Sequence, residues 1–285
     1  RNDDPPGSGL LAGRTRQAVA ATVRDGGSVL LFTTRRGGAV RCVRCRTLRT
    51  CPSCGARPDA GDACPRCGAA IGACESCGGR RFEQLGAGVG RIVSEASGVF
   101  GRDVVGDASA GRAVVVGTER DLPGLSVDLS VIVDADGPLL APHYRAAEDG
   151  LRIMARAVAA AGRGRGRRGI VQTAMPDTPA IEALRRAEPL PFLHRVLAER
   201  DDLGFPPAGE LIALEVRDAT DRADRELREA IGDRATILGP AGDDDMRWLL
   251  QARDLGPARI TLRGLVHRWR EAGARVRVDA DPIDL

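Results

Sequence analysis

The sequence predicts an α/β protein that carries an inserted metal-binding segment and ends in a separate, small α+β domain. Over the first part of the chain, short apolar runs bounded by turn residues alternate with stretches of helical spacing, a pattern typical of buried strands covered by helices. All eight cysteines fall within residues 42–77, as four C-x-x-C pairs. From Met175 onward, prolines punctuate the chain and a new alternation of strands and helices begins, which indicates a second domain.

Composition limits the classes of protein to which the chain can belong. Its 285 residues suffice for two domains or one large one, and 43% of them are hydrophobic, enough for real cores. No apolar run has the length of a membrane-spanning helix, so no membrane partner is expected. A net charge of +3 gives no reason to expect bulk polyanion binding, and with lysine absent any phosphate contact depends on arginine. The chain begins with Arg1 instead of methionine, as expected of a fragment of a longer protein.

The first expected elements are a helix and a buried strand. Residues 1–9 are rich in Pro, Gly and Asp and predict a flexible leader. Apolar residues then recur at helical spacing from Leu10 to Val23, up to a turn at residues 25–27. The apolar run 28–33 follows and predicts a short strand.

The cysteine pairs predict two zinc sites. Two residues between cysteines let both thiolates bind one ion, and two such knuckles complete a tetrahedral Cys₄ site, which is usually structural. Glycine, which can adopt the positive φ of a knuckle turn, follows three of the four pairs, whereas Arg46 follows the first. A disulfide framework is the alternative, but such domains are usually small and secreted, while reduced cysteines argue for the cytoplasm. We expect two structural Zn²⁺ ions held by Cys42, Cys45, Cys51, Cys54, Cys64, Cys67, Cys74 and Cys77.

The loop lengths favour a nested pairing of the knuckles. Nine residues separate the second pair from the third, a comfortable length for antiparallel knuckles, so Cys51 and Cys54 are expected to join Cys64 and Cys67. The first and fourth pairs then form the other site. A sequential pairing has to close knuckles across only five or six residues, which is a tighter geometry.

The stretch after the cysteines alternates between turns, helices and strands. A glycine-rich turn at residues 85–91 lacks the strand and acidic residue that a dinucleotide loop requires. Strands are expected at residues 112–117 and 127–133. The second ends in Asp134 and Asp136, at the strand end where α/β proteins place their sites. A ligand-binding pair of carboxylates and an ordinary acidic turn both agree with this pattern.

A glycine–arginine run is the densest local concentration of positive charge. A helix expected at residues 144–161 leads into this run at residues 162–169, and five arginines fall between positions 156 and 168. Arginines at this density can bind phosphates. The alternative is a solvated turn between that helix and a strand expected at residues 170–173.

The C-terminal part predicts its own mixture of elements. A helix at residues 192–203 ends at a Gly-Phe-Pro-Pro turn. Beyond it we expect four strands and two intervening helices: strands at 211–216, 237–238, 248–252 and 276–278, and helices at 221–231 and 262–271. Such an alternation is typical of a small α+β domain.

Several motifs match one protein family in the same order. The run L-L-F-T-T-R-R-G from Leu30 stands directly before a C-x₂-C-x₅-C-x₂-C start, and G-A-G at residues 86–88 follows the last knuckle. Further matches are G-T at 117–118, D-A-D at 134–136, P-H-Y-R-A-A-E at 142–148, L-G-F-P-P at 203–207, L-G-P at 238–240 and V-D-A-D-P at 278–282. With these motifs, which run through nearly the whole chain, the sequence resembles the C-terminal half of the bacterial replication-restart family PriA (primosomal protein N′).

The resemblance implies the second lobe of a superfamily 2 helicase, a RecA-like parallel sheet, with an inserted two-zinc module and a C-terminal α+β domain. On this basis the lobe comprises residues 1–39 and 83–175, the zinc insertion residues 40–82 and the last domain residues 176–285. The resemblance also implies binding to forked or single-stranded DNA and to other primosome proteins, the replicative helicase loader and single-strand binding protein among them. A cytoplasmic, nucleoid-associated protein is therefore expected.

The chain departs from the family pattern where the family hydrolyses ATP. The family's arginine-finger motif resembles Q-V-x-G-R-A-G-R, but Arg156 stands here for the glutamine and Ala160 for the first arginine. The lysine-containing loop after G-T is replaced by E-R-D-L-P from Glu119, the G-x-G turn lacks its Thr-Glu, and the chain holds no phosphate loop. Loss of a positioned cation slows phosphoryl transfer by several orders of magnitude. We therefore expect no catalytic and no cofactor-binding residues, and a restart factor without helicase activity.

Two other functions agree with the same sequence. The chain can be the C-terminal part of an active ATP-dependent 3′–5′ DNA helicase whose motor lobe lies outside it. It can also be a zinc-ribbon interaction module unrelated to replication, since such ribbons occur in many assemblies. The ordered C-terminal motifs count against the last of these.

Charge decides where we expect DNA contacts. Eight arginines against three acidic residues lie between Val40 and Phe82, but each Zn²⁺ with four thiolates carries a net charge of −2. The zinc segment is therefore close to neutral and is expected to serve shape and partner docking. Phosphate contacts are expected at Arg35, Arg36, Arg163, Arg165, Arg167 and Arg168.

Overall fold

The computed structural model describes residues 9–35, 39–55, 58, 62–64, 67–141, 143–162, 167–218, 222–242 and 245–282. Most of the expected leader lies outside the described residues, as do Arg36, Arg163 and Arg165. The chain divides into two compact units, one of Arg1–Leu139 with Asp149–Ile181 and one of Leu140–Glu148 with Glu182–Leu285. No helix in the described part is long and apolar enough to cross a membrane.

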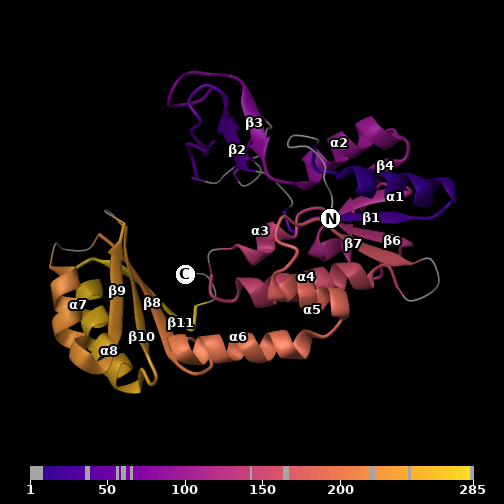
Figure 1. Ribbon diagram of the computed structural model, residues 1–285. Coiled ribbons are helices and arrows are strands. Elements are labelled where there is room, and N and C mark those ends of the chain that lie inside the picture. The colour runs from indigo at the N-terminus through magenta and orange to yellow at the C-terminus, as the bar shows by residue number, and fades with distance from the viewer. Residues whose placement is uncertain are drawn as a thin grey trace. The chain divides into compact units, whose positions relative to one another are not determined.

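The first unit is built around a parallel five-stranded sheet (Figure 1). Its strands, in the spatial order β4-β5-β1-β6-β7, are Val105–Asp107, Val114–Gly117, Val29–Phe32, Leu129–Ile132 and Arg168–Val171. Every residue of β1 and β6 is buried, because parallel strands in the middle of a sheet are covered on both faces. The expected strands at 28–33, 112–117, 127–133 and 170–173 are therefore confirmed, with shifts of a few residues at their ends.

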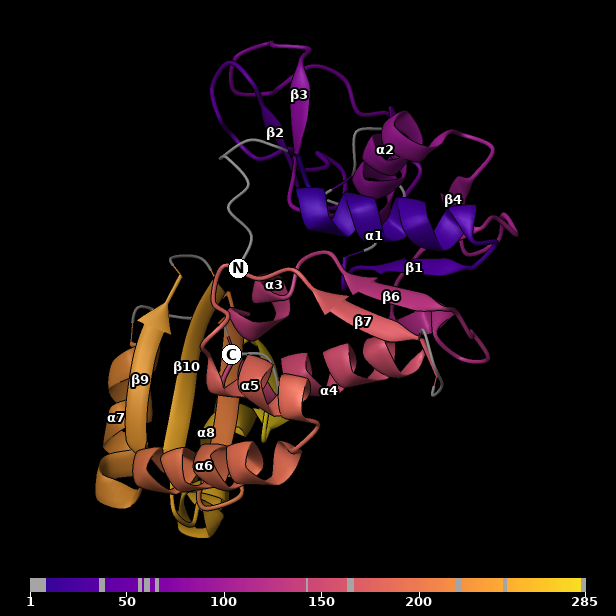
Figure 2. The ribbon, with the colours of Figure 1, turned by 45° about the vertical axis from the view of Figure 1, so that its right-hand side comes forward.

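Helices cover both faces of this sheet. Figure 2 shows α1 (Gly13–Arg24) and α2 (Val89–Phe100) on one side of the strands and α4 (Ala146–Ala159) on the other. Val29 and Leu31 pack with α1 and α2 in one buried cluster, as the alternation of side chains along a strand requires. On the opposite face, the Ser130 hydroxyl donates a 2.7 Å hydrogen bond to a carbonyl of α4.

Five short elements of this unit were not expected from the sequence. Strand β4 has only three residues, one of them glycine, and its apolar pattern is too short to detect. Strands β2 (Ala39–Cys42) and β3 (Phe82–Leu85) form an antiparallel pair that flanks the cysteine segment. A short helix, α3 (Asp136–Leu139), and a 3₁₀ turn, η1 (Glu119–Asp121), complete the unit.

The second unit contains an antiparallel four-stranded sheet in the order β11-β8-β10-β9. Along the chain its elements are β8 (Glu210–Arg217), α7 (Ala223–Ile231), a 3₁₀ turn η2 (Gly232–Arg234), β9 (Thr236–Ala241), β10 (Asp245–Ala252), α8 (Gly256–Glu271) and β11 (Arg275–Ala280). This β-α-β-β-α-β succession is the ferredoxin-like arrangement. Both helices pack on one face of the sheet around the buried Trp248 and Trp269, so the expected α+β domain is confirmed.

Two helices precede that domain, α5 (Pro179–Arg186) and α6 (Pro189–Leu203). Helix α6 ends at Gly204, whose φ of 67° is the left-handed conformation of a helix C-terminus. Within the second unit, the following Phe205 stacks on Tyr144 with ring centroids 5.2 Å apart. Arg200 of α6 lies over the same tyrosine ring and pairs with Glu148. Two of the family-like motifs, at 142–148 and 203–207, thus contact each other.

Candidate metal centre and nucleic-acid interface

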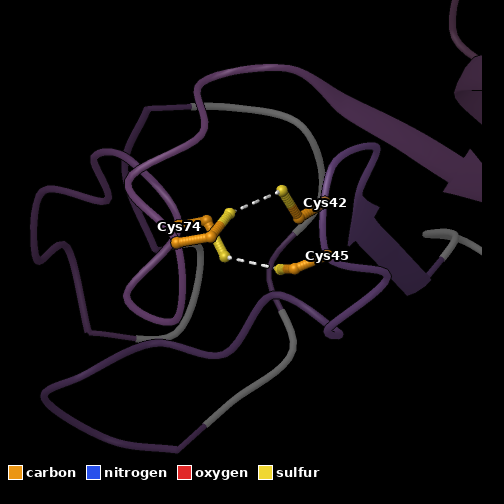
Figure 3. Close-up of side chains that lie close together, drawn as sticks. Cys42, Cys45 and Cys74 are labelled. Atoms are coloured by element: carbon orange, nitrogen blue, oxygen red, sulfur yellow. Dashed lines mark hydrogen bonds between the residues drawn. The ribbon is translucent and has the colours of Figure 1, made fainter.

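The eight cysteines form two clusters. Cys42, Cys45, Cys74 and Cys77 make one, here called the outer site, and Cys51, Cys54, Cys64 and Cys67 make the other, the inner site; within each cluster the four Sγ atoms lie within 4.8 Å of one another. Figure 3 shows Cys42 and Cys45 pointing toward Cys74. This grouping is the nested arrangement that the loop lengths predict.

Each knuckle is closed by the same turn. The amide of the residue after each pair donates to the carbonyl of the pair's first cysteine, as from Gly55 to Cys51 at 2.9 Å. Gly55, Gly68 and Gly78 have φ values of 67°, 74° and 69°, and Arg46 takes the same conformation with φ 63°. For an L-residue this conformation is strained. The Arg46 guanidinium pairs with Glu83 at 2.9 Å, which offsets part of that strain.

The geometry of both clusters fits a tetrahedral thiolate site. With Zn–S bonds of about 2.3 Å, the sulfurs of a tetrahedron lie about 3.8 Å apart. The Sγ atoms of Cys42 and Cys77 are 3.5 Å apart, and those of Cys54 and Cys64 are 3.7 Å apart. Four soft sulfur donors in this arrangement suit Zn²⁺ and leave no open position for a substrate.

The electrostatics of the outer site also fit a bound cation. Hydrogen bonds from the hydroxyl and then the backbone amide of Thr47 lower the pKa of Cys45 to about 6. A backbone hydrogen bond from Gly79 favours the thiolate of Cys77, but the neighbouring thiol of Cys45, burial and the remaining thiols together raise its pKa to about 12. Crowded thiols cannot all lose their protons unless a metal ion offsets the charge.

Of the six arginines expected to contact phosphate, the three that the structure describes do not form one surface. Arg35 is exposed and follows the carboxyl end of β1, where its guanidinium lies near Gly86. Arg168 is the first residue of β7 and aligns with Leu129 at the start of β6. The two arginines therefore lie at opposite ends of the parallel strands, Arg35 at the carboxyl ends and Arg168 at the amino ends.

Arg167 is largely occupied by contacts within the protein. Its guanidinium donates to Ser126 Oγ at 3.0 Å and lies 3.9 Å from the Asp128 carboxylate. An open hollow of about 660 Å³ beside it is lined by Thr22, Asp25, Gly26, Gly27, Asp128, Arg167 and Arg168. The carboxylates of Asp25 and Asp128 oppose an anion in this hollow, which both arginines line.

The acidic turn after β6 is occupied by structural hydrogen bonds. Asp134 accepts the amide of Gly137 at 2.9 Å, and Asp136 accepts the amide of Ala174 at 2.8 Å as well as the Thr173 hydroxyl. These bonds fix the turn into α3 and join it to the end of β7. The geometry favours the acidic turn over a ligand-binding pair of carboxylates.

The positions that depart from the helicase pattern contact one another. Glu119, which replaces part of the family's lysine loop, binds Arg156 of α4 and lies 3.5 Å from Arg152. Ala160, at the arginine-finger position, is buried, and its carbonyl accepts the amide of Val127 at 2.9 Å. These contacts bind the segment into the sheet and pair the Arg152 and Arg156 guanidinium groups with Glu119.

One residue of the metal segment was missed. Arg49 is buried at 7% exposure, contacts the loop of the inner site and packs on the strand next to the outer site. Its sequence context, between two cysteine pairs in an arginine-rich run, is that of a solvated side chain. No local pattern distinguishes it from its neighbours, since its role depends on contacts formed only in the folded segment.

Comparison with known proteins gives one consistent result. No protein-family model matches the chain. It is 31% identical to the probable replication restart protein PriA of Mycobacterium leprae in an alignment of 250 positions that covers 79% of the chain. It is 32% identical to that of Mycobacterium tuberculosis strain H37Rv in an alignment of 318 positions that covers 94% of the chain. The replication restart protein PriA of Treponema pallidum is 29% identical over 60% of the chain. The chain spans less than half the length of these relatives, from 29% to 48%.

Proposed function

Because the chain is a homologue of the replication restart protein PriA, we propose that it acts in replication restart as a factor that binds DNA at stalled forks and docks other primosome proteins. It does so without hydrolysing ATP through residues of its own. The observation that carries this proposal is the similarity to these relatives across both compact units and the cysteine segment. A zinc-ribbon module alone has no reason to resemble them outside its cysteines.

The metal segment supplies shape in this proposal. The two clusters would hold one Zn²⁺ each, and the fixed knuckles would present their loops to a partner protein. Chemistry at the ions is not required, because four thiolates close each coordination sphere. The docked partners would be primosome components, including the helicase loader and single-strand binding protein, in a cytoplasmic protein associated with the nucleoid.

DNA contacts in this proposal are made by arginines outside the metal clusters. Arg168 is exposed at the start of β7 and has no ion-pair partner among the residues that the structure describes. It belongs to the glycine–arginine run of residues 162–169, which also includes Arg163 and Arg165. Arg35 would contact DNA separately, at the other end of the strands. Each such contact releases counterions and makes binding dependent on salt.

Absence of ATP hydrolysis is supported by the pairing of Glu119 with Arg152 and Arg156 and by the buried Ala160. A γ-phosphate in transfer needs a positioned, unpaired cation. The alternative, part of an active 3′–5′ helicase, is favoured by one observation, that the relatives are more than twice as long as the aligned region. A motor lobe with G-x-x-x-x-G-K-T encoded directly upstream would support the alternative.

Binding to forked DNA tests the proposal. The chain should bind a labelled fork more tightly than a blunt duplex of equal length, measured by fluorescence anisotropy, and ATP should leave the affinity unchanged within twofold. Equal binding to fork and duplex would exclude the fork-binding role. Binding that depends on ATP would instead favour the motor-lobe alternative.

A further inference from the structure

Arg49 contacts the surroundings of both metal clusters, and we propose that it couples them. Loss of the metal ion from one site then speeds loss of the second ion from the other site. The proposal goes beyond DNA binding and requires only that the two Cys₄ clusters hold metal. It assigns a positioning role to a residue that is not itself a ligand.

The first part of the link runs from Arg49 to the inner site. Its Nη2 atom donates to the carbonyl of Ile71 at 2.8 Å and to that of Gly72 at 3.2 Å. Ile71 is buried and packs in one cluster with the inner-site ligands Cys51 and Cys64. The guanidinium therefore holds the backbone of the loop whose side chain supports the inner thiolates.

The second part of the link runs from Arg49 to the outer site. Its Cζ atom lies 4.4 Å from the ring centroid of Phe82, a cation–π distance, and Phe82 is aligned with the outer ligand Cys42 across β2 and β3. The Arg49 amide donates to Val40 on the same strand as Cys42, at 2.7 Å. A neighbouring bridge between Arg41 and Leu48 continues this pairing.

Arg49 and the glycine that it contacts also stand close in sequence to ligands of the two sites. Arg49 stands two residues before the inner ligand Cys51, and Gly72 stands two residues before the outer ligand Cys74. A shift of the loop on loss of the inner ion is thus passed through the guanidinium to residues next to both halves of the outer site. A planar guanidinium can hold two carbonyls and an aromatic face at once, which an ammonium cannot.

Charge adds to the geometry. Each Cys₄ cluster with Zn²⁺ carries a net charge of −2, and Arg49 is a buried cation in contact with the loops of both. Removal of a buried partner of this kind costs more than that of a surface cation. Residues that orient metal ligands commonly change metal affinity by about 10- to 100-fold when mutated.

The test compares zinc release from the wild type and three variants of the full chain. After the zinc content has been measured, release to a coloured chelator is followed for the wild type, Arg49→Met, Arg49→Lys and Arg80→Met. Arg80 is an exposed arginine of the same segment and serves as the matched control. We expect Arg49→Met to speed release from both sites by at least about tenfold, Arg49→Lys to be intermediate, and Arg80→Met to stay within twofold of the wild type.

A double-substitution cycle isolates the coupling itself. Cys54→Ser, which removes an inner ligand, should speed release of the outer ion in the Arg49 background but not in the Arg49→Met background. Circular dichroism of each variant verifies that the chain as a whole is folded, and fluorescence of Trp248 and Trp269 verifies this for the second unit. Two ions released independently in the wild type, or an Arg49→Met effect equal to that of Arg80→Met, overturns the proposal. A chain that holds no zinc would overturn the metal assignment as well, whereas fork binding would be unaffected by failure of the coupling.

Discussion

The carboxylate of Glu119 binds the guanidinium of Arg156, which joins the segment after β5 to helix α4. Glu119 follows the G-T turn at the end of β5, and Arg156 lies on α4, which packs over the sheet. Each side chain thereby offsets the other's charge at the protein surface. Arg152, 3.5 Å from the same carboxylate, adds a second cation to this closed cluster.

We predict that the chain does not hydrolyse ATP. Arg152 and Arg156 are paired with Glu119, and Ala160, at the position expected for the arginine finger, offers no cation to a γ-phosphate. Phosphate release in the presence of forked DNA should equal the protein-free background. Fork-stimulated release that a single substitution such as Arg156→Ala abolishes would contradict this prediction.

We predict that substitutions of ligands from the same cluster remove the same ion. The Cys42→Ser/Cys77→Ser double variant should retain one zinc per chain, because both residues belong to the outer site. Cys42→Ser combined with Cys54→Ser should retain none. Metal analysis of the purified variants is the measurement, and the opposite result would require a sequential pairing of the knuckles.

The Arg46 turn offers a stabilising substitution. Arg46 has φ 63°, a conformation that costs an L-residue about 1–2 kcal/mol, while its solvent-exposed ion pair with Glu83 offsets only a small part of that cost. Arg46→Gly should therefore stabilise the segment by about 1 kcal/mol, measured as zinc retention against a chelator. Gly55→Ala is the reverse substitution and serves as the control. Gly55 has φ 67° with no atom within 4 Å of an added Cβ, so Gly55→Ala should destabilise the segment by a similar free energy. A destabilised Arg46→Gly variant would show that the ion pair outweighs the strain.

The core of the second unit contains a hydrogen bond donated by the indole of the buried Trp248. Trp248 is 1% exposed, and its Nε1 donates to Asp224 at 2.9 Å. Asp224→Ala leaves that donor unpaired and should lower the free energy of unfolding by about 1–3 kcal/mol. Urea titration followed by circular dichroism measures the loss, and in a Trp248→Phe background the same substitution should cost much less. An equal cost in both backgrounds would mean that the bond contributes nothing.

Acid should weaken the same interaction. Hydrogen bonding to Arg228, with a further bond from Trp248, holds the pKa of Asp224 below its ordinary 3.8. A depressed folded-state pKa contributes stability that is fully present above pH 3.8 and is lost as the pH falls through the lower, folded-state value. Tryptophan fluorescence during acid titration should therefore change below pH 3.8, and Asp224→Asn should remove that part of the pH dependence. A transition that Asp224→Asn leaves unchanged would assign the acid sensitivity to other carboxylates.

Much of the fold could be predicted from the sequence because its strands are strongly apolar. The runs around Leu30 and Leu129 can only be buried in the middle of a sheet, and the cysteine spacing alone indicates two nested sites. Strands β2 and β3 could not be predicted, since they are set by pairing across about forty residues of intervening chain and have no local period.

The site was predictable only where chemistry is local. The spacing of the cysteines predicts which of them share a metal ion, whereas the spacing of the arginines does not predict what each arginine contacts. Arg35 and Arg168 were both predicted to contact phosphate, yet the direction of the strands places them at opposite ends of the parallel sheet. Arg49 resembles its solvated neighbours in sequence, and its burial results from contacts with Phe82 and with carbonyls more than twenty residues away.

The salt dependence of fork binding tests the central claim most directly. Removing one arginine that binds a phosphate should reduce the slope of log affinity against log salt by about one unit. Arg165→Ala with Arg168→Ala should therefore flatten the slope by about two units, while the matched pair Arg80→Ala with Arg81→Ala in the near-neutral metal segment should leave it almost unchanged. A larger effect of the metal-segment pair, or a slope that neither pair alters, would contradict the account.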